Sequence, residues 1–134
     1  FSGSGIVGIE AASRGCSPVH LVESDRKKKS TIDKNISFVE SEITLFPVPV
    51  ERYLRQCRST YSIIFTDPPF SYKEKPKLIE LIAEKSVPAD NGILMIHYPR
   101  EEELPERILT LTRFDRRTFG RSVLDFFRQT GQDE

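Results

Sequence analysis

Apolar and polar residues follow two different periods along this chain, and each period is typical of one kind of element. Apolar residues recur at helical spacing over residues 6–13 and 75–86, which we expect to be helices. Further helices are expected over residues 26–38, behind Asp25 as a cap, and near residues 50–57. Short apolar runs bounded by proline, glycine or polar residues predict buried strands at residues 19–23, 43–48, 61–66 and 93–97.

The end of the chain has a different pattern, with alternating segments at residues 108–116 and 122–128 on either side of Gly120. Alternation around a turn predicts an antiparallel pair of strands. The preceding strands and helices predict a Rossmann-like α/β fold, a doubly wound and mostly parallel sheet that binds ligands at the carboxyl ends of its strands. We expect one domain over residues 1–134. Such a sheet should open with a strand before Gly3, so we expect the chain to be a fragment that lacks its first strand.

Length and charge limit the classes of protein to consider. With 134 residues the chain can build one compact core, and no apolar run approaches the roughly 18 residues that a membrane span needs. The 20 basic and 20 acidic residues cancel, which argues against a protein that coats nucleic acid through many phosphate contacts. Three clusters are candidates for a local basic surface: Arg26–Lys29, Lys73/Lys75/Lys77 and Arg113/Arg116/Arg117/Arg121. We expect a cytoplasmic monomer without a metal site.

A glycine-rich loop precedes the first predicted helix. Gly3, Gly5 and Gly8 have the GxGxxG spacing, and Glu23 ends the next predicted strand. Such glycines let a ligand approach the backbone where a helix begins, and the acid can accept hydrogen bonds from ribose hydroxyls. The pattern suits NAD or S-adenosylmethionine, because both present a ribose to an acid at this place. A tight turn with a helix cap is the structural alternative.

An acid, two prolines and an aromatic follow the strand predicted at residues 61–66: Asp67, Pro68, Pro69 and Phe70. The lone pair of an exocyclic amino group on a nucleobase is delocalised into the ring. The Asp67 carboxylate and the Pro68 carbonyl can accept its two N–H groups and turn that lone pair towards a methyl donor. Phe70 offers a face for an unstacked base. These four residues, the tip of the strand, favour a site for methyl transfer to an amino group, with no metal required. The structural alternative is a strand-ending turn with a buried Phe.

The segment from Phe1 to Gly15 closely resembles the FxGxGxxGxEAxSRG signature of bacterial 16S ribosomal RNA guanine-N2 methyltransferases, the small-subunit methyltransferase D family. Leu21–Asp25 resembles that family's LVExD, and Asp67–Phe70 resembles its DPPY/F. The resemblance implies a class I methyltransferase that uses S-adenosylmethionine and acts on a guanine N2 amino group of 16S rRNA, within a small-subunit particle.

The same resemblance implies roles for particular residues. Four of them are expected beside S-adenosylmethionine, the last of them on its ribose: Phe1, Gly3, Gly5 and Glu23. Residues 67–70 are expected to hold the guanine amino group. In the family a polar residue after the third strand reaches the adenine, whereas Pro47–Glu51 occupies that region here. We therefore expect apolar packing by Val50 at the adenine.

Other functions stay open on the residues alone. The tip would also serve methylation of adenine N6 or of a glutamine amide, and the glycine loop would also serve an NAD-dependent oxidoreductase. A methyltransferase-like domain that binds RNA without catalysis is a further alternative. His20 and His97 each stand on a predicted strand with no partner at a telling spacing, so we expect both to be structural.

Overall fold

The computed structural model describes residues 1–130, so residues 131–134 of the predicted domain lie outside the described part. The chain forms two compact units, Phe1–Tyr53 and Leu54–Glu134. Each unit is described by itself below. Within residues 1–130, no helix is long and apolar enough to cross a membrane.

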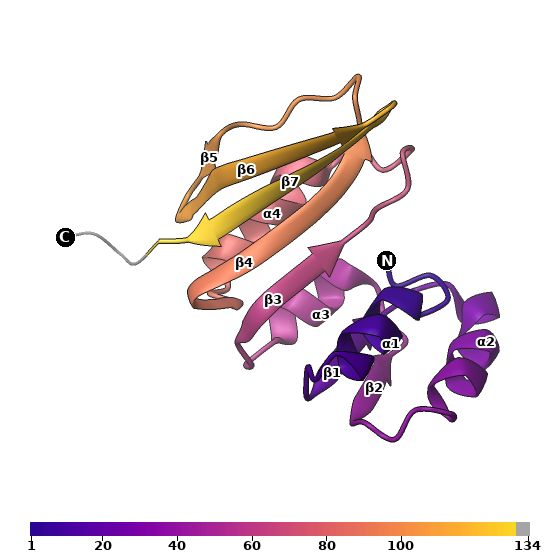
Figure 1. Ribbon diagram of the computed structural model, residues 1–134. Helices are drawn as coiled ribbons and strands as arrows, with labels where there is room; N and C mark the ends of the chain where they lie inside the picture. Colours follow the sequence, from indigo (N-terminus) through magenta and orange to yellow (C-terminus); the bar gives the residue numbers. More distant parts are fainter. Residues whose placement is uncertain (131–134) are drawn as a thin grey trace. The chain divides into compact units, whose positions relative to one another are not determined.

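The first unit alternates helices and strands: α1 (Ile6–Ser13), β1 (Val19–Val22), α2 (Arg26–Ile36) and β2 (Ile43–Phe46) (Figure 1). Helix α3 (Val50–Gln56) begins in this unit. Strands β1 and β2 pair in parallel, with Val19 opposite Ile43. Buried side chains from α1, β1 and α2 form the core of the unit: Ala12, Val19, Leu21 and Ile32.

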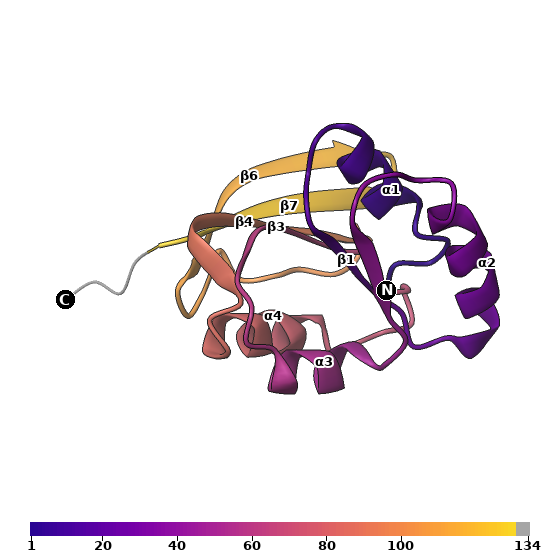
Figure 2. The same ribbon diagram turned by 90° about the horizontal axis from the view of Figure 1, so that it is seen from below.

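The second unit is built on a five-stranded sheet in the order β3-β4-β7-β6-β5. Its elements are β3 (Tyr61–Thr66), α4 (Lys75–Glu84), β4 (Pro88–Pro99), β5 (Arg107–Ile108), β6 (Leu111–Phe119) and β7 (Ser122–Gln129). Strands β3 and β4 are parallel, and the other three pairs are antiparallel. Helix α4 lies against one face of this sheet (Figures 1 and 2). The α/β class and the closing antiparallel hairpin are as predicted, and parallel pairing in this sheet is confined to β3 and β4.

The strand predicted at residues 93–97 is longer than expected. Strand β4 begins at Pro88, so Asn91 and Gly92 lie inside it instead of in a turn before it. Asn91 has a φ of 62°, and the pairing with β3 shifts register between Tyr61 and Ile63. A Cβ at Gly92 would lie 3.0 Å from the carbonyl oxygen of Tyr61, which is closer than such contacts normally come. The Asn-Gly pair therefore forms an irregularity that the strand needs a glycine to accommodate.

Several ends also differ by a few residues. The helix predicted over residues 26–38 ends at Ile36, and the strand predicted over 43–48 ends at Phe46. Pro47 comes next and has no N–H to donate to a neighbouring strand. The start of α2 is as predicted, because the Asp25 side chain accepts a hydrogen bond from the backbone N–H of Lys27 at 2.9 Å.

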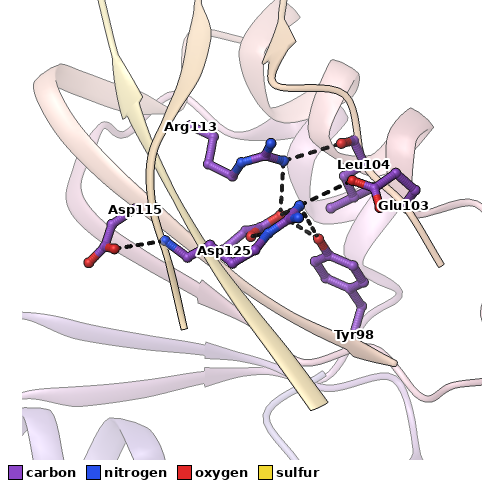
Figure 3. Close-up of polar contacts among 7 residues, drawn as sticks. Tyr98, Glu103, Leu104, Arg113, Asp115 and Asp125 are labelled. Carbon is purple, nitrogen blue, oxygen red and sulfur yellow. Dashed lines mark hydrogen bonds and ion pairs between the residues drawn. The ribbon is translucent and has the colours of Figure 1, made fainter. Parts of the chain in front are cut away.

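A buried carboxylate joins three strands of the second sheet (Figure 3). Asp125 on β7 is 0% exposed and accepts a hydrogen bond from the hydroxyl of Tyr98 on β4. Arg116 on β6 pairs with both of its oxygens, Nε at 2.7 Å and Nη2 at 3.1 Å. These partners offset the desolvation of the charge. Burial and the bond to Asp125 raise the pKa of Tyr98, and the bond to Asp125 raises the pKa of Arg116.

The same network corrects one candidate basic surface. Arg113 donates to Asp125 Oδ2 at 3.4 Å and to the backbone oxygen of Leu104 at 3.2 Å. Two members of the predicted arginine cluster, Arg113 and Arg116, are therefore committed to a buried carboxylate. These two side chains are therefore paired within the sheet instead of forming an unpaired basic surface.

Candidate active site

The glycine loop precedes α1 and is hydrogen-bonded to the end of β1. The backbone nitrogens of Phe1 and Ser2 both lie within hydrogen-bond distance of the carbonyl oxygen of Val22, at 2.7 and 3.1 Å. Gly5 is the N-cap of α1 with a φ of 83°, a left-handed conformation that favours glycine. A Cβ at Gly8 would lie 2.3 Å from a methyl group of Leu21, so the absence of a side chain lets α1 pack closely on β1.

Glu23 lies directly after β1 and braces this loop. Its side chain is buried, with 7% of the residue exposed. Oε1 accepts a hydrogen bond from the N–H of Gly3 at 2.7 Å, and Oε2 accepts one from the N–H of Asp25 at 3.0 Å. The residues gave no sign of this bracing role. Each carboxylate oxygen can accept a further hydrogen bond, so the arrangement remains compatible with a ribose.

The loop leaves open space and one unsatisfied polar atom at its start. Space is open beside Gly3, where a Cβ would meet nothing within 4 Å. The hydroxyl oxygen of Ser2 is buried and has no hydrogen-bond partner among residues 1–130. A buried hydroxyl without a partner is costly, and a ligand group can satisfy it. Phe1 is partly buried at the start of the loop, and Val50 is partly buried at the first position of α3.

The predicted tip follows β3 in the second unit. Pro68 is among the fully buried side chains, whereas Phe70 is 48% exposed. Phe70 is therefore not a core residue, in contrast to the structural alternative weighed for this motif. The carbonyl oxygen of Pro69 accepts a hydrogen bond from the N–H of Tyr72 at 2.8 Å. The carbonyl of Pro68 receives no hydrogen bond from the described residues, so it is free to accept one from a ligand.

Asp67 makes a contact that the sequence did not suggest. Its Oδ1 lies 2.7 Å from Nδ1 of His97, which stands on β4. The His97 ring also lies beside Phe70, with ring centroids 5.9 Å apart. The spacing of the two residues in the sequence gave no indication of this contact. The register could have revealed the pair, because Thr66 lies opposite Ile96 and the next residues on the two parallel strands are Asp67 and His97.

The segment after the tip is anchored by a buried lysine. Lys75 at the start of α4 is 0% exposed, and its Nζ donates to the carbonyl oxygen of Tyr72 at 2.6 Å. The same Nζ pairs with Glu102 at 2.9 Å. Lys75 was one member of a candidate basic cluster with Lys73 and Lys77, and its burial removes it from any such surface. Its charge holds the end of the tip segment.

The described residues offer no conventional metal centre. No group of three or more His, Cys, Asp or Glu side chains in residues 1–130 is placed to hold a metal ion.

Comparison with known proteins assigns the chain to a family. Residues 1–128 match the family described as Conserved hypothetical protein 95. The chain belongs to this family. The curated relatives include "Putative rRNA methyltransferase YlbH" of Bacillus subtilis, 31% identical over 136 residues that cover 98% of this chain and 74% of that protein. "Ribosomal RNA small subunit methyltransferase D" of Buchnera aphidicola is 32% identical over 110 residues, 78% of this chain and 56% of that protein. The chain thus spans little more than half of the second relative.

A solved structure agrees with this assignment. "Putative methyltransferase yhhF" from Escherichia coli superposes with a TM-score of 0.89 at 24% identity, over 98% of this chain and 74% of that one. This likeness concerns the fold. The family resemblance inferred from the FxGxGxxGxEAxSRG segment is confirmed, and so is the class I methyltransferase fold.

Proposed function

We propose that this protein transfers a methyl group from S-adenosylmethionine to the exocyclic N2 amino group of a guanine in 16S rRNA. The observation that carries the proposal is the tip after β3. It combines a carboxylate, Asp67, a carbonyl without a partner among the described residues, at Pro68, and an exposed ring, Phe70. The names of the relatives support rRNA as the substrate.

In this proposal the tip prepares the amine. Asp67 Oδ2 accepts one N–H of the amino group and the Pro68 carbonyl accepts the other, so the nitrogen lone pair leaves the plane of the base. Pro69 and the buried Pro68 keep that carbonyl fixed. Phe70 supports the base from one face. These groups are held in place before the substrate arrives, which lowers the entropy lost on reaching the reactive geometry.

The cofactor is proposed to lie on the first unit. Phe1, Gly3 and Gly5 would border it, Glu23 would hold its ribose, and Val50 would pack on its adenine. When bound, it supplies the methyl carbon as the carbon–sulfur bond of its sulfonium breaks and leaves a neutral thioether. The amine nitrogen forms the new bond to carbon and loses one proton, which Asp67 Oδ2 accepts and passes to water.

The experiment uses the intact protein with unmethylated 30S particles and labelled S-adenosylmethionine. Asp67→Ala should bind the cofactor with an unchanged Kd but lower kcat by roughly a hundredfold or more, because the acceptor for the amine is lost. Asp90→Ala removes an exposed aspartate of β4 and serves as the matched control, with wild-type activity expected. Undiminished methylation by Asp67→Ala would contradict the role of the tip.

Mapping the methylated nucleotide separates the enzymatic alternatives. Label on guanine N2 of 16S rRNA supports the proposal, whereas label on adenine N6 or on a glutamine amide replaces it with one of the related amino-group activities. Calorimetric titration with NAD and with S-adenosylmethionine tests the alternative of an NAD-dependent oxidoreductase. Tight binding of NAD without binding of S-adenosylmethionine would support that alternative and contradict the proposal. We further propose that the protein acts as a monomer in the cytoplasm, on RNA within a small-subunit particle.

A further inference from the structure

His97 is the one imidazole at the tip, and it contacts two of the residues proposed to handle the amine. It lies one residue beyond Ile96 on β4, and Asp67 lies one residue beyond Thr66 on the neighbouring parallel strand. The side chains of Asp67 and His97 are 48% and 28% exposed. Because the Asp67 carboxylate is half exposed, its hydrogen bond to His97 is a specific restraint on its rotamer.

The hydrogen-bond inventory assigns the proton between the two residues. An ionised carboxylate only accepts hydrogen bonds, so at the 2.7 Å contact the imidazole donates from Nδ1–H to Asp67 Oδ1. In the neutral ring this places the lone pair on Nε2. Oδ2 of Asp67 accepts no hydrogen bond from the described residues and is left for a ligand.

We infer that His97 is a positioning residue of the methyl-transfer reaction, whose Nδ1–H fixes Asp67 so that Oδ2 meets the substrate amino group. The inference rests on the proposed function of the tip. His97 does not exchange its proton during the reaction; the proton released by the amine goes to Asp67 Oδ2 and then to water. The surroundings agree with this role, because the residue opposite His97 on β7 is the apolar Leu124. The imidazole has no other carboxylate within hydrogen-bond distance among residues 1–130.

The imidazole of His97 also packs against the ring of Phe70. The two rings are tilted by 53° with centroids 5.9 Å apart, which is within the range of favourable aromatic contact. His97 thus contacts both Asp67 and Phe70. A substitution at this position has to separate the donated hydrogen bond from the ring contact.

Two substitutions make that separation. His97→Asn keeps an N–H donor on the atom bonded to Cγ and removes the ring, whereas His97→Phe keeps a ring beside Phe70 and removes the donor. With the intact protein and 30S particles, His97→Phe should lower kcat by about 10- to 100-fold, the loss expected when a reacting group is misplaced. KM for RNA and for the cofactor should stay within about twofold, and His97→Asn should recover most of the lost kcat.

A spectroscopic measurement reports on the pair independently of activity. Long-range nitrogen–proton NMR spectra of the protein should show His97 as the Nδ1-protonated tautomer. The same signal in Asp67→Ala should revert to the mixture of tautomers seen for an ordinary exposed imidazole.

The matched control for the kinetic experiment is His20→Phe. His20 lies in the first unit, with its ring centroid 5.2 Å from that of Phe46, and the variant should retain wild-type kcat.

The outcomes separate the inference from the function on which it rests. If the wild-type protein methylates no RNA, the proposed function fails, and the NMR experiment still tests the Asp67–His97 bond. If the wild type is active and His97→Phe keeps its kcat, the positioning role is overturned while the function stands. Equal loss in His97→Asn and His97→Phe would also overturn it, because an N–H donor at this position would then not restore kcat.

Discussion

Glu23 illustrates how much one side chain can hold. Its two oxygens accept the N–H groups of Gly3 and Asp25, so a single carboxylate connects the glycine loop to the turn that leads into α2. Hydrogen bonds to a charged group contribute about 1.5–3 kcal/mol each, more than bonds between neutral groups. We therefore expect Glu23 to matter for the shape of the loop as well as for direct contact with a ligand.

Glu23→Gln tests this at the level of one oxygen. The amide keeps one acceptor and replaces the other with a donor, so it cannot accept from both backbone N–H groups. We expect the Kd for S-adenosylmethionine to rise by about 10- to 100-fold, equivalent to one or two charged hydrogen bonds. Calorimetry measures the change, with Glu40→Gln, at an exposed position, as the matched control. An unchanged Kd in Glu23→Gln would show that neither oxygen matters for the cofactor.

At the scale of elements, the second sheet depends on a polar contact within its interior. Asp125, Tyr98 and Arg116 stand on β7, β4 and β6, and their hydrogen bonds cross from strand to strand. The network links β7 to both of its neighbours, β4 and β6. On β4, His97 comes directly before Tyr98, so its side chain lies on the opposite face of the sheet. The stability of this network therefore bears on the geometry of the tip.

The raised pKa of Tyr98 makes the free energy of unfolding depend on pH. Above its ordinary pKa of 10.0, the hydroxyl loses its proton in the unfolded chain but keeps it in the folded one. The unfolded state then binds fewer protons, so stability falls as pH rises, by about 1.4 kcal/mol per pH unit for this group. Denaturant unfolding of the wild type between pH 9 and pH 11, on the order of one unit to either side of that pKa, should show this loss.

Tyr98→Phe provides the comparison. The variant should be less stable than the wild type by roughly 1–3 kcal/mol at neutral pH, because Asp125 loses a buried donor. Its stability should fall less steeply above pH 10, since no hydroxyl remains at this position. Tyr53→Phe makes the same exchange outside the network and should keep the steeper fall. Parallel curves for the wild type and Tyr98→Phe would contradict the assignment.

At the scale of the whole molecule, charge limits how RNA can be recognised. The 20 basic and 20 acidic residues balance, and three basic residues once assigned to surface clusters are engaged by buried or partly buried carboxylates: Lys75, Arg113 and Arg116. These three charges are therefore paired within the fold, and the net charge of zero gives no general attraction to phosphate. Recognition by shape and by the target nucleotide fits this balance better than general attraction to RNA.

The balance of basic and acidic residues predicts a preference for assembled particles over naked RNA. We expect kcat/KM to be at least about tenfold higher on 30S particles than on naked 16S rRNA, because a folded particle presents one structured site. We also expect a shallow dependence on salt, since the slope scales with the number of phosphates neutralised. Methylation rates on both substrates at two salt concentrations test this. Equal rates on naked RNA, or a steep salt dependence, would contradict it.

Local chemistry explains why so much of the fold was predictable. Helix α1 after its glycines, α2 behind Asp25, and β3 before two prolines all have their limits set by neighbouring residues, and the structure has them close to the predicted places. The tip and the glycine loop are equally local, because each lies within a few consecutive residues. The start of β4 was the exception. An Asn-Gly pair predicts a turn from the sequence alone, whereas the pairing with β3 extends β4 through it.

The pairing of distant residues needed the folded chain. Asp67 and His97 are 30 positions apart, and Asp125 meets Tyr98 across 27. Which residues meet depends on the register between strands, and a shift of one residue would point every side chain to the opposite face. Composition and periodicity do not specify that register. The sequence therefore determined the elements, the loop and the residues of the tip, whereas the tertiary structure decided which charges are buried and which histidine contacts Asp67.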